Sequence, residues 1–174
     1  YGEGVEDTIH MGVVSSVAGL VGWLPAYCQA HPKVRFELFE GNTYHLLQQI
    51  RAGVLQLAIV RTPFAPGELE TVPLLEESLV AVGKENWFRD ENGYLPETIS
   101  LAELANKPLI VYRRWEGVLS RIFERKGLRL NTFCCNDDAR TTLTWAASGA
   151  GVGILPRSMV RHWNEKNDFE MVFL

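Results

Sequence analysis

The chain has 174 residues, of which 47% are hydrophobic and 22% charged, and its formal net charge is −4. These proportions are typical of a soluble globular protein. No apolar run approaches the ~20 residues of a membrane-spanning helix, and residues 1–4 lack the basic and apolar regions of a signal peptide. The negative charge and the scattered basic residues argue against direct binding of nucleic acid. We therefore expect a chain that does not contact membranes. Its three cysteines are not a disulfide framework, which favours the reducing cytoplasm.

The first third of the chain alternates between predicted strands and helices. Apolar or alternating segments predict strands at 9–14, 34–40 and 55–60. A helix over 17–30 follows the first strand, although Pro25 requires either a kink or a start near Gly22. Asn42 or Thr43 caps the next helix. These strand–helix–strand steps predict right-handed crossovers in a parallel sheet.

The pattern changes after residue 67, where two strands follow without an intervening helix, at 69–75 and 78–82. We interpret this change as the crossing into a second lobe, and expect lobes at 1–80 and 81–174. The elements expected in the second lobe are a helix opened by a Ser100–Glu103 capping box, a strand at 108–112, a loop at 113–117, a helix at 118–126, a strand at 132–136, a helix opened by Asp137 or Asp138, a glycine-rich turn at 149–153 leading to a short strand, a helix from Pro156 toward Trp163 and a last strand at 169–174.

Polar side chains gather where the predicted strands end, which is where open α/β sheets bind ligands. The candidate ligand-binding residues are Ser15, Ser16, Thr43, Arg61, Arg113, Arg114 and Trp115. The two serines either cap the first helix or hold an anion at its positive end. Arg61 contacts either a ligand or a carboxylate such as Glu37 or Glu40, because an unpaired charge at the end of a buried strand is costly.

In the second lobe, at most one of the two adjacent arginines is expected to face the ligand, since neighbours on an extended segment point in opposite directions. That arginine would offer a bidentate contact to a carboxylate. Trp115 either stacks on the ligand or covers the hinge.

The sequence does not favour a catalytic site, a metal site or a nucleotide-binding site. The four histidines are dispersed and have no nucleophile partner at a suitable turn, and no histidine or cysteine spacing fits a zinc site. Cys134 and Cys135 lie in a predicted buried strand with Phe133, where a thiol behaves as a small apolar group. The glycine run at 149–153 lies between a helix and a strand, the reverse of a dinucleotide-binding turn. We expect no catalytic residue, no metal and no cofactor.

The order of several short motifs resembles the effector-binding domain of LysR-type transcriptional regulators. The matching segments are Gly12-Val13-Val14-Ser15-Ser16, Leu24-Pro25, His31-Pro32, Glu40-Gly41, Ile50-Arg51-Ala52-Gly53, Leu57-Ala58-Ile59, Pro108-Leu109-Ile110 and Gly149-Ala150-Gly151-Val152-Gly153-Ile154-Leu155-Pro156. They span nearly the whole chain in the family's order. Gln56 departs from the family, which usually has an aspartate there, so one polar anchor of the fold is in question.

The resemblance implies an α/β fold of two Rossmann-like lobes with a ligand cleft between them, like a type 2 periplasmic binding protein. It implies a sensing domain that binds a small anionic effector, for which Ser16 and Thr43 occupy positions that commonly contact the ligand. DNA would be bound only by a helix-turn-helix domain outside this chain, and a strand and helix would return to the first lobe after Leu174. The rival functions are a transporter's solute-binding protein and, less favoured, an enzyme on the same scaffold.

The family also implies a homodimer or homotetramer in which the first lobe of one subunit packs beside the second lobe of its partner. Two apolar helix faces are the candidate surfaces, and their residues are Leu20, Trp23 and Tyr27 in the first lobe and Leu119, Ile122 and Phe123 in the second. Exposed apolar surface of this kind marks interfaces, although the same side chains would also fit the cores of their own lobes.

Overall fold

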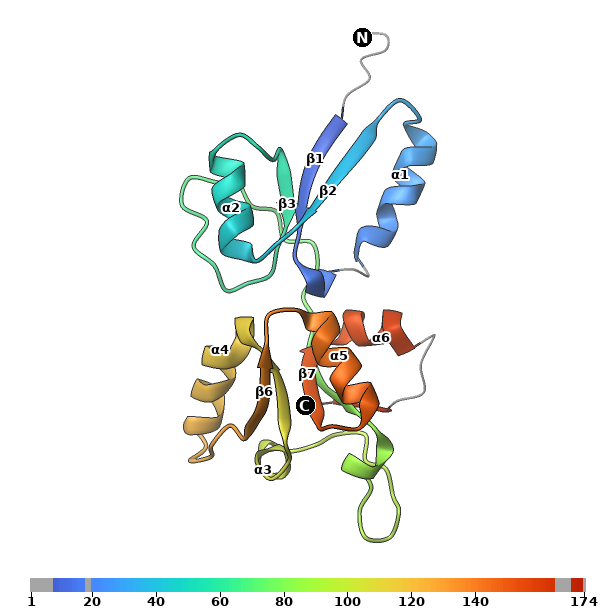
Figure 1. The fold of residues 1–174 in the computed structure, drawn as a ribbon, viewed down its shortest axis with the longest axis vertical. Coiled ribbons are helices and arrows are strands. Elements are labelled where there is room, and N and C mark those ends of the chain that lie inside the picture. Colours follow the sequence, from blue (N-terminus) through green and yellow to red (C-terminus); the bar gives the residue numbers. More distant parts are fainter. Residues whose placement is uncertain (1–7, 18–19, 165–169, 174) are drawn as a thin grey trace. The chain divides into compact units, whose positions relative to one another are not determined.

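The computed structural model describes residues 8–17, 20–164 and 170–173. The chain forms two compact units, unit 1 (Tyr1–Leu75) and unit 2 (Glu76–Leu174), each with its own sheet (Figure 1). The boundary between the units falls after Leu75 in the chain, whereas the sequence analysis placed it after residue 80. Each unit is of the α/β class, as the alternation of strands and helices indicated.

Unit 1 contains a parallel sheet of three strands in the order β2-β1-β3. Its elements are β1 (Thr8–Val13), 3₁₀ turns at Ser15–Val17 and Leu20–Trp23, α1 (Leu24–Ala30), β2 (Arg35–Glu40), α2 (Thr43–Arg51) and β3 (Leu57–Ile59). The predicted long helix is therefore confined to α1, and Pro25 lies in its first turn. Proline is tolerated there because the first-turn N–H groups have no partner within the helix.

Helix α2 packs closely on the sheet of unit 1 because the strand beneath it carries a glycine. A Cβ atom on Gly12 would lie 2.8 Å from Cδ2 of Leu46, a core residue of α2. Gln56 connects the start of β3 to β1. Its side-chain Oε1 accepts a hydrogen bond from the backbone amide of His10 at 2.7 Å, and its backbone amide donates to the His10 carbonyl at 3.0 Å. Glutamine thus provides the polar anchor at the position where the family usually has aspartate.

Unit 2 contains a mixed sheet in the order β6-β5-β7-β4-β8. Its elements are β4 (Leu79–Gly83), a 3₁₀ turn at Glu85–Trp87, α3 (Leu101–Ala105), β5 (Leu109–Tyr112), α4 (Arg113–Glu124), β6 (Thr132–Asn136), α5 (Ala139–Ser148), β7 (Val152–Pro156), α6 (Arg157–Asn164) and β8 (Glu170–Phe173). β5 is parallel to β6 and β7, and β4 is antiparallel to β7 and β8. The strand predicted at 69–75 is wrong, because that segment has no regular secondary structure.

The helix starts of α3 and α5 follow local side-chain chemistry, but that of α4 does not. Ser100 and Glu103 form the predicted capping box of α3, and Asp138 caps α5 by accepting from the Arg140 amide at 2.8 Å. Helix α4 begins at Arg113 directly after β5. The loop predicted at 113–117 is therefore wrong, since those residues form the first turns of the helix.

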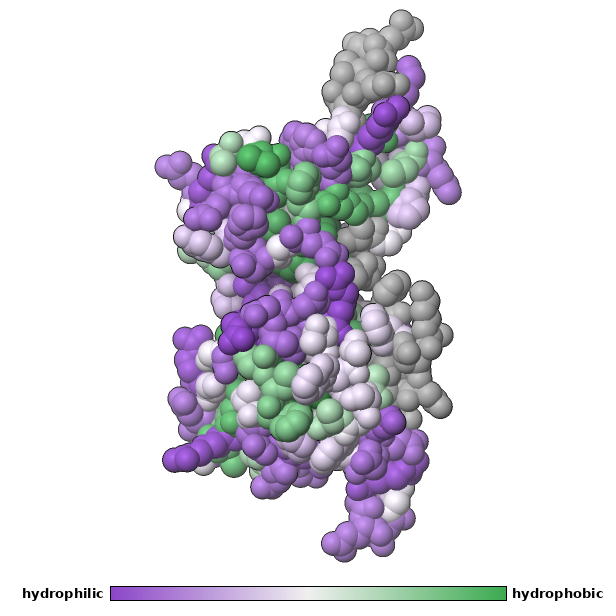
Figure 2. All heavy atoms as spheres, in the orientation of Figure 1, coloured by the Kyte–Doolittle hydropathy of each residue, from purple (hydrophilic) through white to green (hydrophobic). Residues whose placement is uncertain are grey.

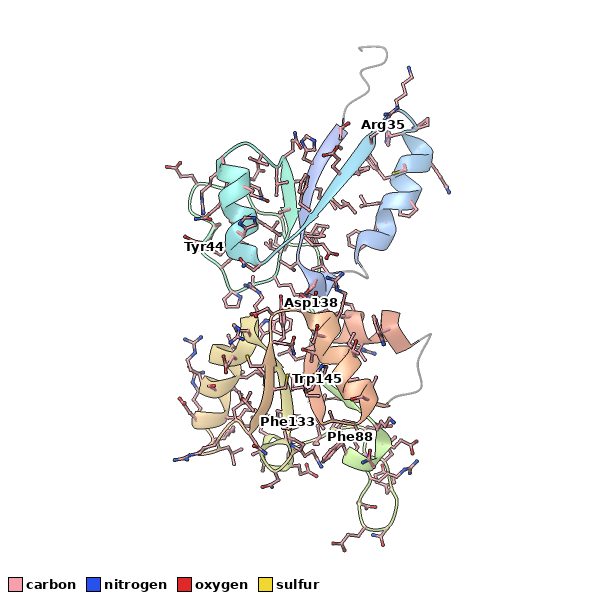
Figure 3. All side chains as sticks on the ribbon, viewed as in Figure 1. Arg35, Tyr44, Phe88, Phe133, Asp138 and Trp145 are labelled. Atoms are coloured by element: carbon pink, nitrogen blue, oxygen red, sulfur yellow. The ribbon has the colours of Figure 1, made fainter. Side chains whose placement is uncertain are left out.

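Burial in unit 2 differs from the sequence prediction on two outer elements. Leu119 and Phe123 of α4 lie in the core of the unit, so Ile122 alone remains exposed from the predicted apolar face. Phe133 was predicted to be buried but is 57% exposed, because β6 is an edge strand. It lies near Trp145 of α5, with ring centroids 6.3 Å apart (Figure 3). Figure 2 shows hydrophobic side chains reaching the surface in this part of unit 2.

Candidate functional site

The carboxyl ends of the three parallel strands of unit 1 lie at one edge of their sheet. Val13 of β1 pairs with Glu40 of β2 on one side and with Ile59 of β3 on the other, so the residues that follow these strands emerge together. These residues are the Ser15–Val17 turn after β1, the start of α2 after β2 and Arg61 after β3. Parallel order thus brings the predicted site residues of this half of the chain to one place.

Ser16 and Arg61 are in direct contact at this edge. Nε of Arg61 donates to Oγ of the fully buried Ser16 at 3.1 Å, and Nη2 donates to the Ser16 carbonyl oxygen at 2.9 Å. Glu37, one of the carboxylates considered as a partner for Arg61, lies 3.3 Å from Nε2 of His10. Because the hydroxyl oxygen accepts from a cation, its own proton must point elsewhere. As far as its contact with Arg61 is concerned, the Ser16 hydroxyl can therefore act as a donor toward a further partner.

Thr43 is the first residue of α2 and carries an unsatisfied buried hydroxyl. Its side chain is 2% exposed, and Oγ1 has no hydrogen-bond partner among the described residues. Asn42 caps the helix by accepting from the His45 amide at 2.9 Å. A buried hydroxyl without a partner is costly, and it lies beside the positive end of the α2 dipole. The start of α2 therefore carries a buried hydroxyl that no described residue satisfies.

The corresponding edge of unit 2 carries the other predicted residues, at the junction of β5 and α4. Nε of Arg113 donates to Oδ1 of Asp137 at 2.7 Å, and this hydrogen bond raises the pKa of the guanidinium above its usual value. Trp115 is buried and packs edge-on against Tyr112 with ring centroids 5.2 Å apart. Arg113 and Arg114 are on a helix, where neighbours are rotated by about 100°, so the argument from an extended segment does not apply to them.

The sequence analysis missed a carboxylate at the start of α6. Oε2 of Glu77 accepts from the Ser158 amide at 2.7 Å, and Oε1 accepts from the Ser158 hydroxyl at 2.8 Å. The proline and serine before the helix indicated where α6 begins, but no local signal indicates a partner 81 positions away. The protein itself therefore supplies an anion to α6, in contrast to α2.

Metal and disulfide chemistry are not supported within the described residues. No group of three or more histidine, cysteine, aspartate or glutamate side chains there is placed to hold a metal ion, and Cys28, Cys134 and Cys135 are free. Burial raises the pKa of the Cys135 thiol, which makes it a poorer nucleophile at neutral pH. No helix in this part of the chain is long and apolar enough to cross a membrane.

Comparison with known proteins gives one consistent match. The family model described as the LysR substrate binding domain matches residues 2–172. The regulator BenM of Acinetobacter baylyi is 28% identical over 166 residues, which cover 88% of this chain and 52% of BenM. An uncharacterized regulator of Bacillus subtilis, YybE, is 24% identical over 152 residues, covering 85% of this chain and 49% of YybE. The chain thus spans about half the length of these relatives.

Solved structures of similar domains share the fold. The effector binding domain of QuiR in complex with shikimate has a TM-score of 0.77 at 16% identity, covering 97% of this chain and 80% of that one. The BenM effector binding domain with benzoate has a TM-score of 0.74 at 24% identity, covering 98% and 78% of the two chains. At these identities the likeness establishes the fold alone.

Proposed function

The chain belongs to the LysR substrate-binding-domain family, and from this premise we propose that it is the effector-sensing and oligomerising domain of a LysR-type transcriptional regulator. Its effector is a small anion, most simply a carboxylate, bound at the edge of unit 1 by Ser16, Thr43 and Arg61. The single observation that carries the proposal is the buried Thr43 hydroxyl without a partner at the start of α2. This group needs an acceptor, and the described protein does not provide one.

The chemistry of the edge favours an anion because its groups are donors. Arg61 directs the Ser16 hydroxyl proton away from itself, the Thr43 hydroxyl can donate, and the first-turn amides of α2 point out of the helix. A neutral ligand would leave several of these donors unpaired, at a cost of about 1–3 kcal/mol each. Shikimate and benzoate, named for two structural relatives, are both carboxylates.

The remaining candidates receive separate roles in this proposal. Ser15 flanks the site as part of the same 3₁₀ turn. At the edge of unit 2, Arg113 or Arg114 offers a contact to a carboxylate, and Arg113 would give up its hydrogen bond to Asp137 to make it. Trp115 supports α4 from within the core and does not stack on the ligand.

Ligand-induced stabilisation tests the site, with benzoate and shikimate as probes and benzyl alcohol as the uncharged control. Binding to the native state at a concentration of 100 Kd adds about 2.7 kcal/mol to the free energy of unfolding. Ser16→Ala, Thr43→Val and Arg61→Ala each remove a hydrogen bond to a charged group, worth about 1.5–3 kcal/mol, so each should weaken binding by roughly ten- to a hundredfold.

The matched control is Thr132→Val, which removes an exposed hydroxyl from the edge strand of unit 2. It should bind each probe as the unmodified chain does. Stabilisation by benzyl alcohol equal to that by the acids, or unchanged affinity in all three site variants, would contradict the anion site. Circular dichroism of each variant without ligand shows whether the variant is folded, and so separates loss of binding from loss of folding.

DNA binding and assembly complete the proposal. The regulator binds DNA through a domain outside this chain, in the cytoplasm, so these residues alone should give no sequence-specific shift of operator DNA. The chain dimerises through α1, which has no buried residue and exposes Tyr27, together with the exposed Trp23 just before it, against the outer face of α4 at Ile122. Tyr27→Glu or Ile122→Glu should then reduce the sedimenting mass, because a buried unpaired charge opposes the contact.

A further inference from the structure

Two segments of unit 2 with opposite charge emerge at the same end of its sheet. Because β4 is antiparallel to β7, the segment that follows β4 lies at the end where the parallel strands β5, β6 and β7 begin. The turn between α4 and β6 leads into the start of β6 and so lies at that end as well (Figure 1). Arg113 and Asp137 follow the carboxyl ends of β5 and β6, and therefore lie at the opposite end.

The segment 85–97, which we call the projecting loop, is held in shape by its own hydrogen bonds. Oδ1 of Asp90 accepts from the amides of Asn92 at 2.9 Å and Tyr94 at 2.8 Å. Arg89 donates to Oε2 of Glu85 at 2.8 Å and also to the Gly93 carbonyl. A loop that is ordered before binding loses less conformational entropy when a partner docks on it.

The base of the projecting loop is fixed to the core of unit 2, while its tip is exposed. Nε1 of Trp87 donates to the Gly149 carbonyl at 3.0 Å, and Phe88 is buried. Tyr94 near the tip is 64% exposed. Tyrosine is enriched among the residues that dominate binding energy in interfaces, so the loop presents a suitable anchor on a rigid support.

The charges of the two segments are complementary. The projecting loop has four carboxylates and one arginine, and Glu91 and Glu97 form no ion pair among the described residues. The last turn of α4 and the turn that follows it, which we together call the basic turn, carry the exposed cations Arg121, Arg125, Lys126 and Arg129. None of these four forms an ion pair with a described carboxylate. Each segment thus exposes charge that has no ion-pair partner among the described residues.

We propose that unit 2 associates end to end with unit 2 of a second copy, with the projecting loop of each copy docked on the basic turn of the other. A two-fold axis repeats both contacts and closes the pair, and it places carboxylates opposite cations twice. A second copy fits better than an unrelated basic protein because one chain carries both complementary surfaces at one end. The contact leaves the opposite end of the unit 2 sheet accessible, where Arg113 and Asp137 follow β5 and β6.

Sedimentation velocity of the Tyr27→Glu chain isolates this contact, because that substitution removes the dimer proposed through α1. The chain should still self-associate at about 100 μM protein in 50 mM NaCl and dissociate in 500 mM NaCl, where screening shortens the reach of exposed charges. Reversing the basic turn (Lys126→Glu with Arg129→Glu) or the loop (Glu91→Lys with Glu97→Lys) should raise the dissociation constant at least ~tenfold. An equimolar mixture of the two reversed chains should associate again.

Lys33→Glu in unit 1 is the matched control for added negative charge, and it should leave the association unchanged. Thermal unfolding must show that each reversed chain is folded, and rescue in the mixture is a second readout that a misfolded variant would not give. A monomeric Tyr27→Glu chain at low salt would overturn the proposal. Association that ignores salt, or that survives both charge reversals, would overturn it as well.

Discussion

Gly151 offers a sharp test of the packing in unit 2. A Cβ atom added there would lie 2.3 Å from the carbonyl oxygen of Pro108, which also accepts a hydrogen bond from the Val152 amide at 2.9 Å. The obstacle is backbone, so no side-chain rotation relieves it, and the start of β7 must move away from the start of β5. Overpacking together with a weakened buried hydrogen bond predicts that Gly151→Ala lowers the free energy of unfolding by about 3 kcal/mol or more.

Gly117→Ala makes the same chemical change where the structure has room. Gly117 lies within α4, and a Cβ atom there would meet nothing within 4 Å. Alanine in a helix interior is more favourable than glycine by about 0.5–1 kcal/mol. This variant should therefore stabilise unit 2 by that amount, opposite in sign to Gly151→Ala.

Urea unfolding followed by tryptophan fluorescence measures both variants, because four of the five tryptophans belong to unit 2. The midpoint of this transition should fall for Gly151→Ala and rise for Gly117→Ala, with equal slopes. If Gly151→Ala stays within about 0.5 kcal/mol of the unmodified chain, or if both changes have the same sign, the strand packing argued above is wrong.

Two further predictions concern titration. The Ser100 hydroxyl and amide lower the pKa of Glu103, so the ionised carboxylate stabilises the fold at pH values above its ordinary pKa, and this contribution is lost as the pH falls through the lowered pKa of the folded state. In thermal melts, the difference in stability between the chain and its Glu103→Gln variant should shrink between about pH 6 and about pH 3. A difference that stays constant would contradict the capping box. Burial raises the pKa of Cys135, so Cys135 should react with iodoacetamide at pH 8 more slowly than a cysteine in a short peptide, as measured by mass spectrometry. Unfolding in urea should remove this difference in rate.

The sequence by itself determined what depends on neighbouring residues. Helix caps such as the Ser100–Glu103 box are set by groups three positions apart, and the alternation over 34–40 that predicted β2 is equally local. The parallel direction of β1, β2 and β3 followed from the repeated strand–helix order, because short crossovers leave few alternatives. This parallel order was sufficient to place Ser16, Thr43 and Arg61 at one edge before any contact was known.

The tertiary structure decided what depends on residues far apart in the chain. Donation from Arg61 to Ser16 joins positions 45 apart, and the capping of α6 by Glu77 joins positions 81 apart. The local sequence also failed to predict the exposure of Phe133, which depends on which strand lies at the edge of the sheet. It failed to predict the start of α4 as well, where the buried Trp115 stabilises the first turn. Side-chain partners and burial are set by the packing of the whole unit, so a pattern read along the chain identifies the candidate residues but not the bonds they make.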